Sequence, residues 1–107
     1  MYYPKMMDIN DIKERVRYGK YRISFTHTEK IRQRKIEISE LEEAILSGEI
    51  IENYPTDPRG PSCLILGYTQ KDRPLHIVCA IMEPELLVIT AYEPGLEEWE
   101  SDWKTRR

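Results

Sequence analysis

The first third of the chain carries apolar residues at helical spacing. From Ile9 to Val16 they recur at i, i+3 and i+7 with charged residues between them, which is typical of an amphipathic helix. Asp8 or Asn10 can cap the start of this helix, and Gly19 can end it. The pattern therefore predicts one short N-terminal helix.

Two capping boxes predict two further helices. The run Thr-His-Thr-Glu that starts at Thr26 favours a brief helix ending near Lys35, because the Thr hydroxyl and the Glu side chain can satisfy free amides at its start. Ser39 and Glu42 form the second box, and Gly48 can supply a left-handed stop. An apolar stripe between them indicates a helix packed on a core.

The remaining pattern is that of strands. Residues 21–25 alternate between apolar and polar side chains, which predicts one strand before the second helix. Four apolar runs separated by turns and a proline-rich loop predict four more strands, over 49–54, 63–68, 75–82 and 86–92. Consecutive strands joined by short turns pair antiparallel. We therefore expect an α+β domain whose N-terminal helices pack on one face of an antiparallel sheet of four to five strands.

The C-terminal residues are polar apart from two tryptophans. Trp99 and Trp103 are spaced i, i+4, which predicts a short terminal helix that docks both indoles. No linker or repeat divides the 107 residues, so we expect a single domain over 1–107. The chain shows no basic-then-apolar leader and no apolar stretch of membrane-spanning length, which favours a cytoplasmic protein without membrane contact.

Charge is distributed unevenly along the chain. The net charge of −3 argues against a nucleic-acid binder, but residues 1–35 hold 10 Lys/Arg against 4 Asp/Glu, whereas residues 36–107 hold 6 against 15. Screening confines a charge's field to about 10 Å at ordinary salt, so a basic third can bind a polyanion locally. The alternative is a solvated basic face without a partner.

Metal and cofactor sites are not indicated. The chain has no C-x-x-C motif, and its two histidines, His27 and His76, lie 49 residues apart. The two cysteines lie in apolar runs, where buried reduced thiols are the usual state. We therefore expect neither a structural metal nor a cofactor.

Several short motifs together resemble a known family. They combine a strand that ends in Ser-Phe-Thr-His, a single arginine, a Gly-Glu-Ile-Ile-Glu strand start, an Arg-Pro-Leu-His strand start and an Ile-Thr-Ala-Tyr strand end. They lie at residues 23–27, 34, 48–55, 73–78 and 89–92, and the likeness runs from about Arg22 to Trp103. This set resembles the bacterial and archaeal family called domain of unknown function 4258.

The resemblance implies a fold and an activity. The family is grouped with small α+β folds that include barnase-like and RelE-like ribonucleases, and its members often look like toxins of toxin–antitoxin pairs. The implied activity is metal-independent cleavage of RNA by an mRNA interferase, and the implied partner is a small zinc-finger antitoxin. A fold hosts many functions, so this remains an expectation.

Metal-free RNA cleavage needs an acid, a base and cations for the phosphate. His27 is the first candidate base, because it lies at the first position of the second predicted helix, beside three free amides. Arg34 shares its helical face and is a candidate catalytic cation. Lys30 and Arg32 of the same helix are candidate RNA-binding residues. The alternative for His27 is an ordinary helix-start residue.

Other candidates come from the predicted strands and loops. His76 begins the longest apolar strand and can serve as the second acid–base group if it opens into the cleft of His27; the alternative is a satisfied, half-buried histidine. Tyr92 can bind phosphate or stack on a base, and Arg59 can clamp RNA from the proline-rich loop. A nuclease would have to keep its acidic segments, 37–52 and 97–102, away from the RNA.

The sequence thus leaves two functions open. One is a small metal-independent endoribonuclease toxin. The other is a non-catalytic α+β module that binds RNA or a protein partner through its basic N-terminal third.

Overall fold

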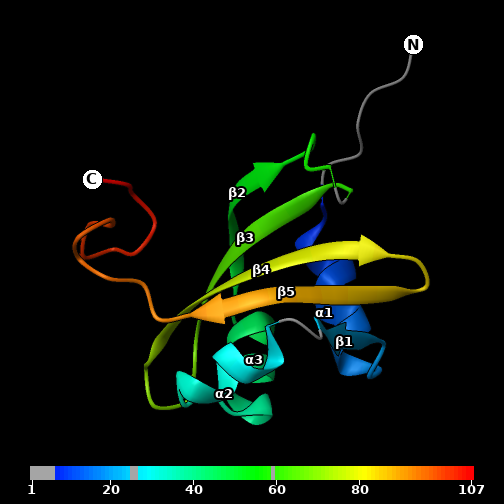
Figure 1. The fold of residues 1–107 in the computed structure, drawn as a ribbon, viewed down its shortest axis with the longest axis horizontal. Coiled ribbons are helices and arrows are strands. Elements are labelled where there is room, and N and C mark those ends of the chain that lie inside the picture. The colour runs from blue at the N-terminus through cyan, green and yellow to red at the C-terminus, as the bar shows by residue number, and fades with distance from the viewer. Residues whose placement is uncertain (1–6, 25–26, 59) are drawn as a thin grey trace.

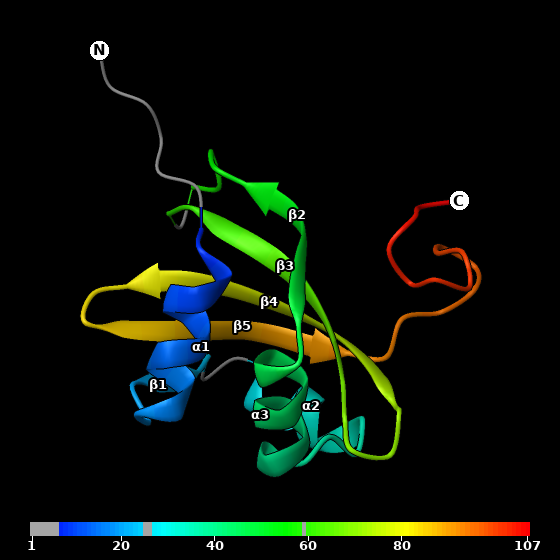
Figure 2. The same ribbon diagram turned by 180° about the vertical axis from the view of Figure 1, so that it is seen from behind.

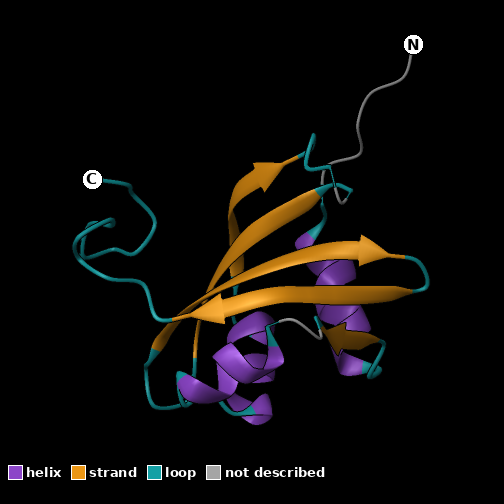
Figure 3. Ribbon diagram, in the orientation of Figure 1, coloured by secondary structure: helices purple, strands orange, loops and turns teal. Residues whose placement is uncertain are grey.

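A five-stranded sheet with three helices forms the domain. The computed structural model describes residues 7–24, 27–58 and 60–107 (Figure 1). In chain order the elements are α1 (Ile9–Arg17), β1 (Tyr21–Ile23), α2 (Thr28–Gln33), α3 (Ile38–Leu46), β2 (Glu49–Tyr54), β3 (Ser62–Tyr68), β4 (Pro74–Met82) and β5 (Glu85–Tyr92). The predicted α+β class is confirmed, and Figure 3 shows the strands gathered into one layer.

Helix α1 forms as its sequence pattern predicts. The Asp8 side chain accepts a hydrogen bond from the Asn10 amide at 2.9 Å and caps the helix. Val16 is buried on the core side, and Gly19 follows the helix with φ +70°, a left-handed conformation that glycine adopts without strain.

The capping of α3 differs from the prediction. Glu37, and not Ser39, is the N-cap, and it forms a capping box with Glu40, whose side chain accepts from the Glu37 amide at 3.1 Å. The helix starts two residues earlier than its Ser-x-x-Glu pattern suggested, because Glu37 and Glu40 have the same i, i+3 spacing. The predicted box at Thr26 lies outside the described residues.

The expected left-handed stop at Gly48 is wrong, and close packing explains this glycine instead. A Cβ on Gly48 would lie 2.6 Å from the Ile65 Cγ2 atom and 2.8 Å from the Ala44 carbonyl oxygen. A Cβ on Gly67 would lie only 1.7 Å from that same oxygen. The two glycines therefore let the backbone of α3 approach β3 closely.

The strand order in the sheet is β1-β5-β4-β3-β2. Strands β2 to β5 pair antiparallel, as the short turns predict. Strand β1 joins the far edge and runs parallel to β5, with Tyr21 opposite Leu86. The parallel pairing is possible because α2, α3 and three strands separate β1 from its partner along the chain.

The two faces of the sheet have different covers. Ile77 and Cys79 of β4 face the helices, where they pack with Ile12 of α1 and Ile45 of α3. Figure 2 shows α1 crossing one face of β4 and β5. Because side chains alternate along a strand, His76 points to the opposite face, which we call the outer face.

Residues 93–107 leave β5 and fold beside the end of the sheet where β4 begins (Figures 1 and 2). The terminal helix expected here is wrong: the segment forms turns closed by one bridge between Trp99 and Arg106. Trp103 has φ +61°, which is outside the helical region. Trp99 is nevertheless buried, with 2% of its surface exposed. Among the described residues, no helix is long and apolar enough to cross a membrane.

Candidate functional site

Helix α2 lies at the edge of the sheet beyond the end of β1. Strand β1 pairs with β5 only as far as Val88, so the following residues of β5 meet α2 instead. Arg34, the C-cap of α2, donates from Nη1 to the Thr90 hydroxyl at 3.2 Å and to the Ala91 carbonyl at 2.8 Å. These two bonds fix Arg34 against the free edge of β5.

Three of the predicted site residues form one line of contacts. The guanidinium carbon of Arg34 lies 6.0 Å from the centre of the Tyr92 ring. Tyr92 is paired across the strands with His76, and their rings meet edge to face at 5.5 Å. The structure therefore brings Arg34, Tyr92 and His76 together, although they are far apart in the sequence.

His27 is the N-cap of α2, one position before the helix in which it was expected. Its ring is half-buried, and Nδ1 is buried without a hydrogen-bond partner among the described residues. The amides of His27 and Thr28 both donate to the Ser24 carbonyl, so they are not free as predicted. Those two amides therefore do not bind a phosphate in this conformation.

His27 and His76 lie at opposite ends of the candidate site and are connected only through the residues between them. His27 and Arg34 share one face of α2 and are separated by roughly 10 Å at 1.5 Å per residue. Ile31 between them is buried, so this face points to the sheet. No direct contact joins His27 to His76 in the part of the chain that the structure describes, and their common cleft stays a prediction.

Lys30 and Arg32 lie on the exposed side of α2. Arg32 is 3.8 Å from Glu29, but their side chains are 78% and 68% exposed, and such a pair contributes little. Both cations thus face solvent where a polyanion can reach them. Arg59, the predicted clamp, lies outside the described residues.

His76 is fully buried on the outer face. Its Nε2 lies 2.8 Å from the Trp103 carbonyl, and since a carbonyl only accepts, this nitrogen carries the proton. Its Nδ1 is buried and has no hydrogen-bond partner among the described residues. Burial lowers the pKa of His76, while the Trp103 carbonyl and the Glu52 charge oppose this and the Arg106 charge adds to it. The imidazole is therefore neutral and closed to solvent.

A second polar cluster on the outer face was missed by the sequence reasoning. Arg106 donates to both carboxylate oxygens of Glu52, at 2.7 and 3.0 Å, and the Tyr54 hydroxyl also donates to Glu52. Chiefly because of Arg106, the pKa of Glu52 lies below its ordinary value. The spacing of Glu52 and Tyr54 places both on one strand face, but nothing local in the sequence points to Arg106.

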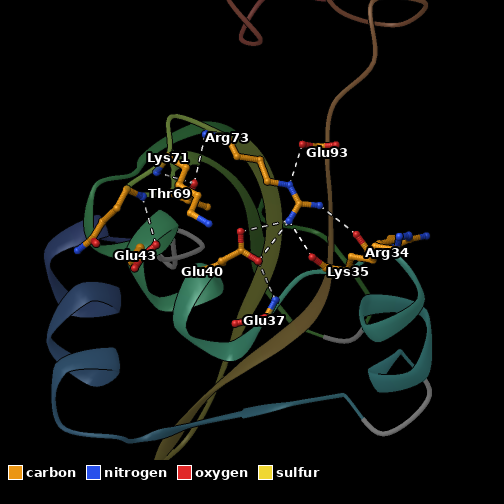
Figure 4. Close-up of polar contacts among 10 residues, drawn as sticks. Arg34, Lys35, Glu37, Glu40, Glu43, Thr69, Lys71, Arg73 and Glu93 are labelled. Carbon is orange, nitrogen blue, oxygen red and sulfur yellow. Dashed lines mark hydrogen bonds and ion pairs between the residues drawn. The ribbon is translucent and has the colours of Figure 1, made fainter.

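Arg73 holds the end of α2 in place (Figure 4). It donates to the backbone carbonyls of Arg34 and Lys35 at 3.0 and 2.8 Å. It also pairs with Glu93 at 2.7 Å and with Glu40 at 3.3 Å. One guanidinium therefore ties together the end of α2, the start of α3 and the end of β5, and so positions Arg34.

The two cysteines do not form a reactive centre. Cys63 and Cys79 are directly opposed across β3 and β4, buried and not bonded to each other. Burial raises the pKa of Cys63 to about 12 and that of Cys79 well above its ordinary value. Among the described residues, no group of three His, Cys, Asp or Glu side chains is placed to bind a metal ion.

Comparison of the sequence with known protein families finds a match that includes the candidate site. The family model described as Domain of unknown function (DUF4258) matches residues 23–93, which include α2, β4 and β5. Comparison with curated proteins and with solved structures finds no match. The segment that covers His76 follows the matched range.

Proposed function

The chain belongs to the DUF4258 family, and from this premise and the geometry of the site we propose that it binds RNA and cleaves it without a metal ion where α2 meets β5. The supporting observation is the line of contacts from Arg34 through Tyr92 to His76. It adjoins a short helix with two exposed cations and a histidine whose Nδ1 has no hydrogen-bond partner within the part of the chain that the structure describes.

The chemistry assigns a separate role to each side chain. His27 takes the proton of the ribose 2′-hydroxyl as general base. Arg34 binds the phosphate through Nε and Nη2, because only its Nη1 is used in the contacts to Thr90 and Ala91. Lys30 and Arg32 attract the neighbouring phosphates.

His76 is the proposed general acid for the leaving oxygen, with Tyr92 beside it as a platform for a base. We further propose that the protein acts in the cell as a toxin, and that a small zinc-finger protein inhibits it.

The burial of His76 favours the second candidate, a non-catalytic module. In that case Lys30, Arg32 and Arg34 bind RNA or an acidic protein partner, and both histidines are structural. The two candidates share one surface and differ in whether a bond in RNA is broken.

End-labelled single-stranded RNAs incubated with the purified protein in excess EDTA distinguish the candidates. We expect cleavage that leaves 2′,3′-cyclic phosphate ends, and a loss of about 10²–10⁴-fold in rate for His27→Ala, the usual contribution of a general base. Lys71→Ala is the matched control, since it removes an exposed cation of the β3–β4 turn and should cleave like the parent. Bound but intact RNA with every substrate would refute the enzyme and support the module. Parent-like cleavage by a folded His27→Ala protein would refute the role of His27.

A further inference from the structure

Residues 95–107, which we call the strap, form a unit with its own hydrogen bonds. The Glu100 amide donates to the Thr105 carbonyl at 2.7 Å, and the Arg107 amide donates to the Glu98 carbonyl at 2.9 Å. The Asp102 carboxylate accepts from the Thr105 amide at 3.0 Å and closes the turn. These bonds lie within the strap and give it a turn structure of its own.

Side chains are the main link between the strap and the sheet. Within the described ranges, no backbone–backbone hydrogen bond joins the two. Arg106 binds Glu52, and Lys104 lies 2.7 Å from Glu49, but both cationic side chains are about half exposed, at 55% and 50%. The buried Trp99 adds an edge-to-face contact on His76 at 4.6 Å. A unit held in this way can detach without breaking the sheet.

The docked strap covers groups that the proposed chemistry needs. It buries His76 completely and occupies its Nε2 with the Trp103 carbonyl. It also covers Tyr92, whose pKa is raised chiefly by burial, while the charges of Arg106 and Glu98 in the strap act on it in opposite directions.

We propose that the strap is an autoinhibitory cover of the RNA site, and that its release as a unit gives RNA access to His76 and Tyr92. This inference rests on the proposed function and adds its regulation. When a ligand binds only the open state, its apparent affinity is the intrinsic affinity multiplied by the fraction of molecules that are open. Weakening the docked state therefore increases RNA binding and cleavage together, without any change in the groups that contact RNA.

Arg106→Ala tests the inference in the whole 107-residue chain. It removes both bonds to Glu52 and the cation that lies 4.5 Å from the centre of the Trp99 ring. Arg107→Ala is the matched control, because it removes the same charge but a side chain whose ion pair, with Glu100 at 3.7 Å, lies inside the strap. Both substitutions are made in a Trp103→Phe background, where Trp99 is the one remaining tryptophan of the two in the chain.

Two measurements distinguish release of the strap from cleavage of RNA. Acrylamide quenching of Trp99 reports release, and cleavage of labelled RNA in EDTA reports activity. We expect Arg106→Ala to raise both several-fold over the parent, with Arg107→Ala close to the parent. Losing a cation alone would weaken RNA binding, so a gain cannot come from the charge change.

The possible failures are distinguishable. Increased quenching with unchanged cleavage by an active parent would overturn the inhibitory role alone. Increased quenching with no cleavage or binding of RNA in any variant would overturn the proposed function and the inhibitory role with it. Unchanged quenching in Arg106→Ala would overturn the release of the strap. If Arg106→Ala fails to fold, Glu49→Gln with Lys104→Ala removes the outer tie instead and has the same expected and contrary results.

Discussion

Replacing Arg73 by Ala is expected to loosen the end of α2 and so displace Arg34. The side chain is only 22% exposed and donates to two backbone carbonyls and two carboxylates. Glu40 is equally buried, at 22%, whereas Glu93 is 52% exposed. The bonds to Glu40 are therefore partly shielded from solvent, whereas the bonds to the Arg34 and Lys35 carbonyls and the pair with Glu93 are exposed.

The expected loss follows from these exposures. Hydrogen bonds that involve a charged group contribute about 1.5–3 kcal/mol each, but they are not additive when one guanidinium makes them all. The exposed pair with Glu93 adds at most about 1 kcal/mol. Glu40 keeps its strongest partner, the Glu37 amide, which contributes more than Arg73 to holding the pKa of Glu40 below its ordinary value. We therefore expect Arg73→Ala to lower the free energy of unfolding by about 2–4 kcal/mol.

Urea unfolding followed by circular dichroism measures this loss, and hydrogen exchange of the Arg34 and Lys35 amides locates it. Arg73→Lys is the informative control, since it keeps the charge but loses the planar fork that reaches both carbonyls. It should recover less than half of the loss. A change below about 0.5 kcal/mol for Arg73→Ala, with unaltered exchange, would show that the cluster does not hold α2.

Two further predictions concern packing and pH. Gly67→Ala should lower stability by about 3 kcal/mol or more, because its Cβ would meet the backbone of Ala44 and not a side chain that can move, whereas Gly95→Ala, with open space around it, should stay within about 0.5 kcal/mol in the same urea assay. Since the buried His76 has a lowered pKa, the open state takes up a proton first as pH falls below the ordinary value near 6.5, so docking of the strap is fully stable above that pH and weakens below it. Quenching of Trp99 between pH 8 and pH 5 should therefore rise on acidification in the Trp103→Phe protein and stay flat after His76→Gln.

The parts of the fold that the sequence predicts are those determined by near neighbours. The apolar runs of residues 75–82 and 86–92 and the short turn between them are enough to define β4 and β5. The left-handed Gly19 likewise follows from its place after an amphipathic helix. The pairing of β1 with β5 depends on residues about 65 positions apart, such as Tyr21 and Leu86, and a pattern of spacing carries no signal for it.

The candidate site shows the same division. His27 and Arg34 could be placed on one face of a helix from their spacing, and the structure agrees for Arg34, which reaches β5. That His76 lies against Tyr92 follows from the register of β4 and β5, which the sequence predicts only loosely. Its cover by the strap could not be predicted, because the i, i+4 spacing of Trp99 and Trp103 indicated a helix, whereas the strap forms turns held by contacts with residues far away in the chain.

The structure also changes how the charge asymmetry should be interpreted. Part of the basic N-terminal third is neutralised within the fold, since Arg15 pairs with Asp11 and Glu83, and Arg22 lies 3.5 Å from Glu85. Among the described residues, the cations that stay exposed without such a pair include Arg17 and Lys20 near the end of α1, and Lys30, Arg34 and Lys35 on and just after α2.

Much of the acidic remainder is also used internally. Glu42 accepts from the Tyr21 hydroxyl, Glu43 from the Gln70 amide and Glu40 from Arg73, while Glu49 and Glu52 pair with the strap. Releasing the strap would uncover the last two carboxylates on β2. The charge of Glu52 reaches His76 on β4, whereas β3 and β4 separate both carboxylates from β5 and α2. A phosphate backbone that followed the edge of β5 would therefore meet the cations of α2. The carboxylates of β2 lie at the opposite edge of the sheet, and screening over about 10 Å weakens their repulsion of the phosphates.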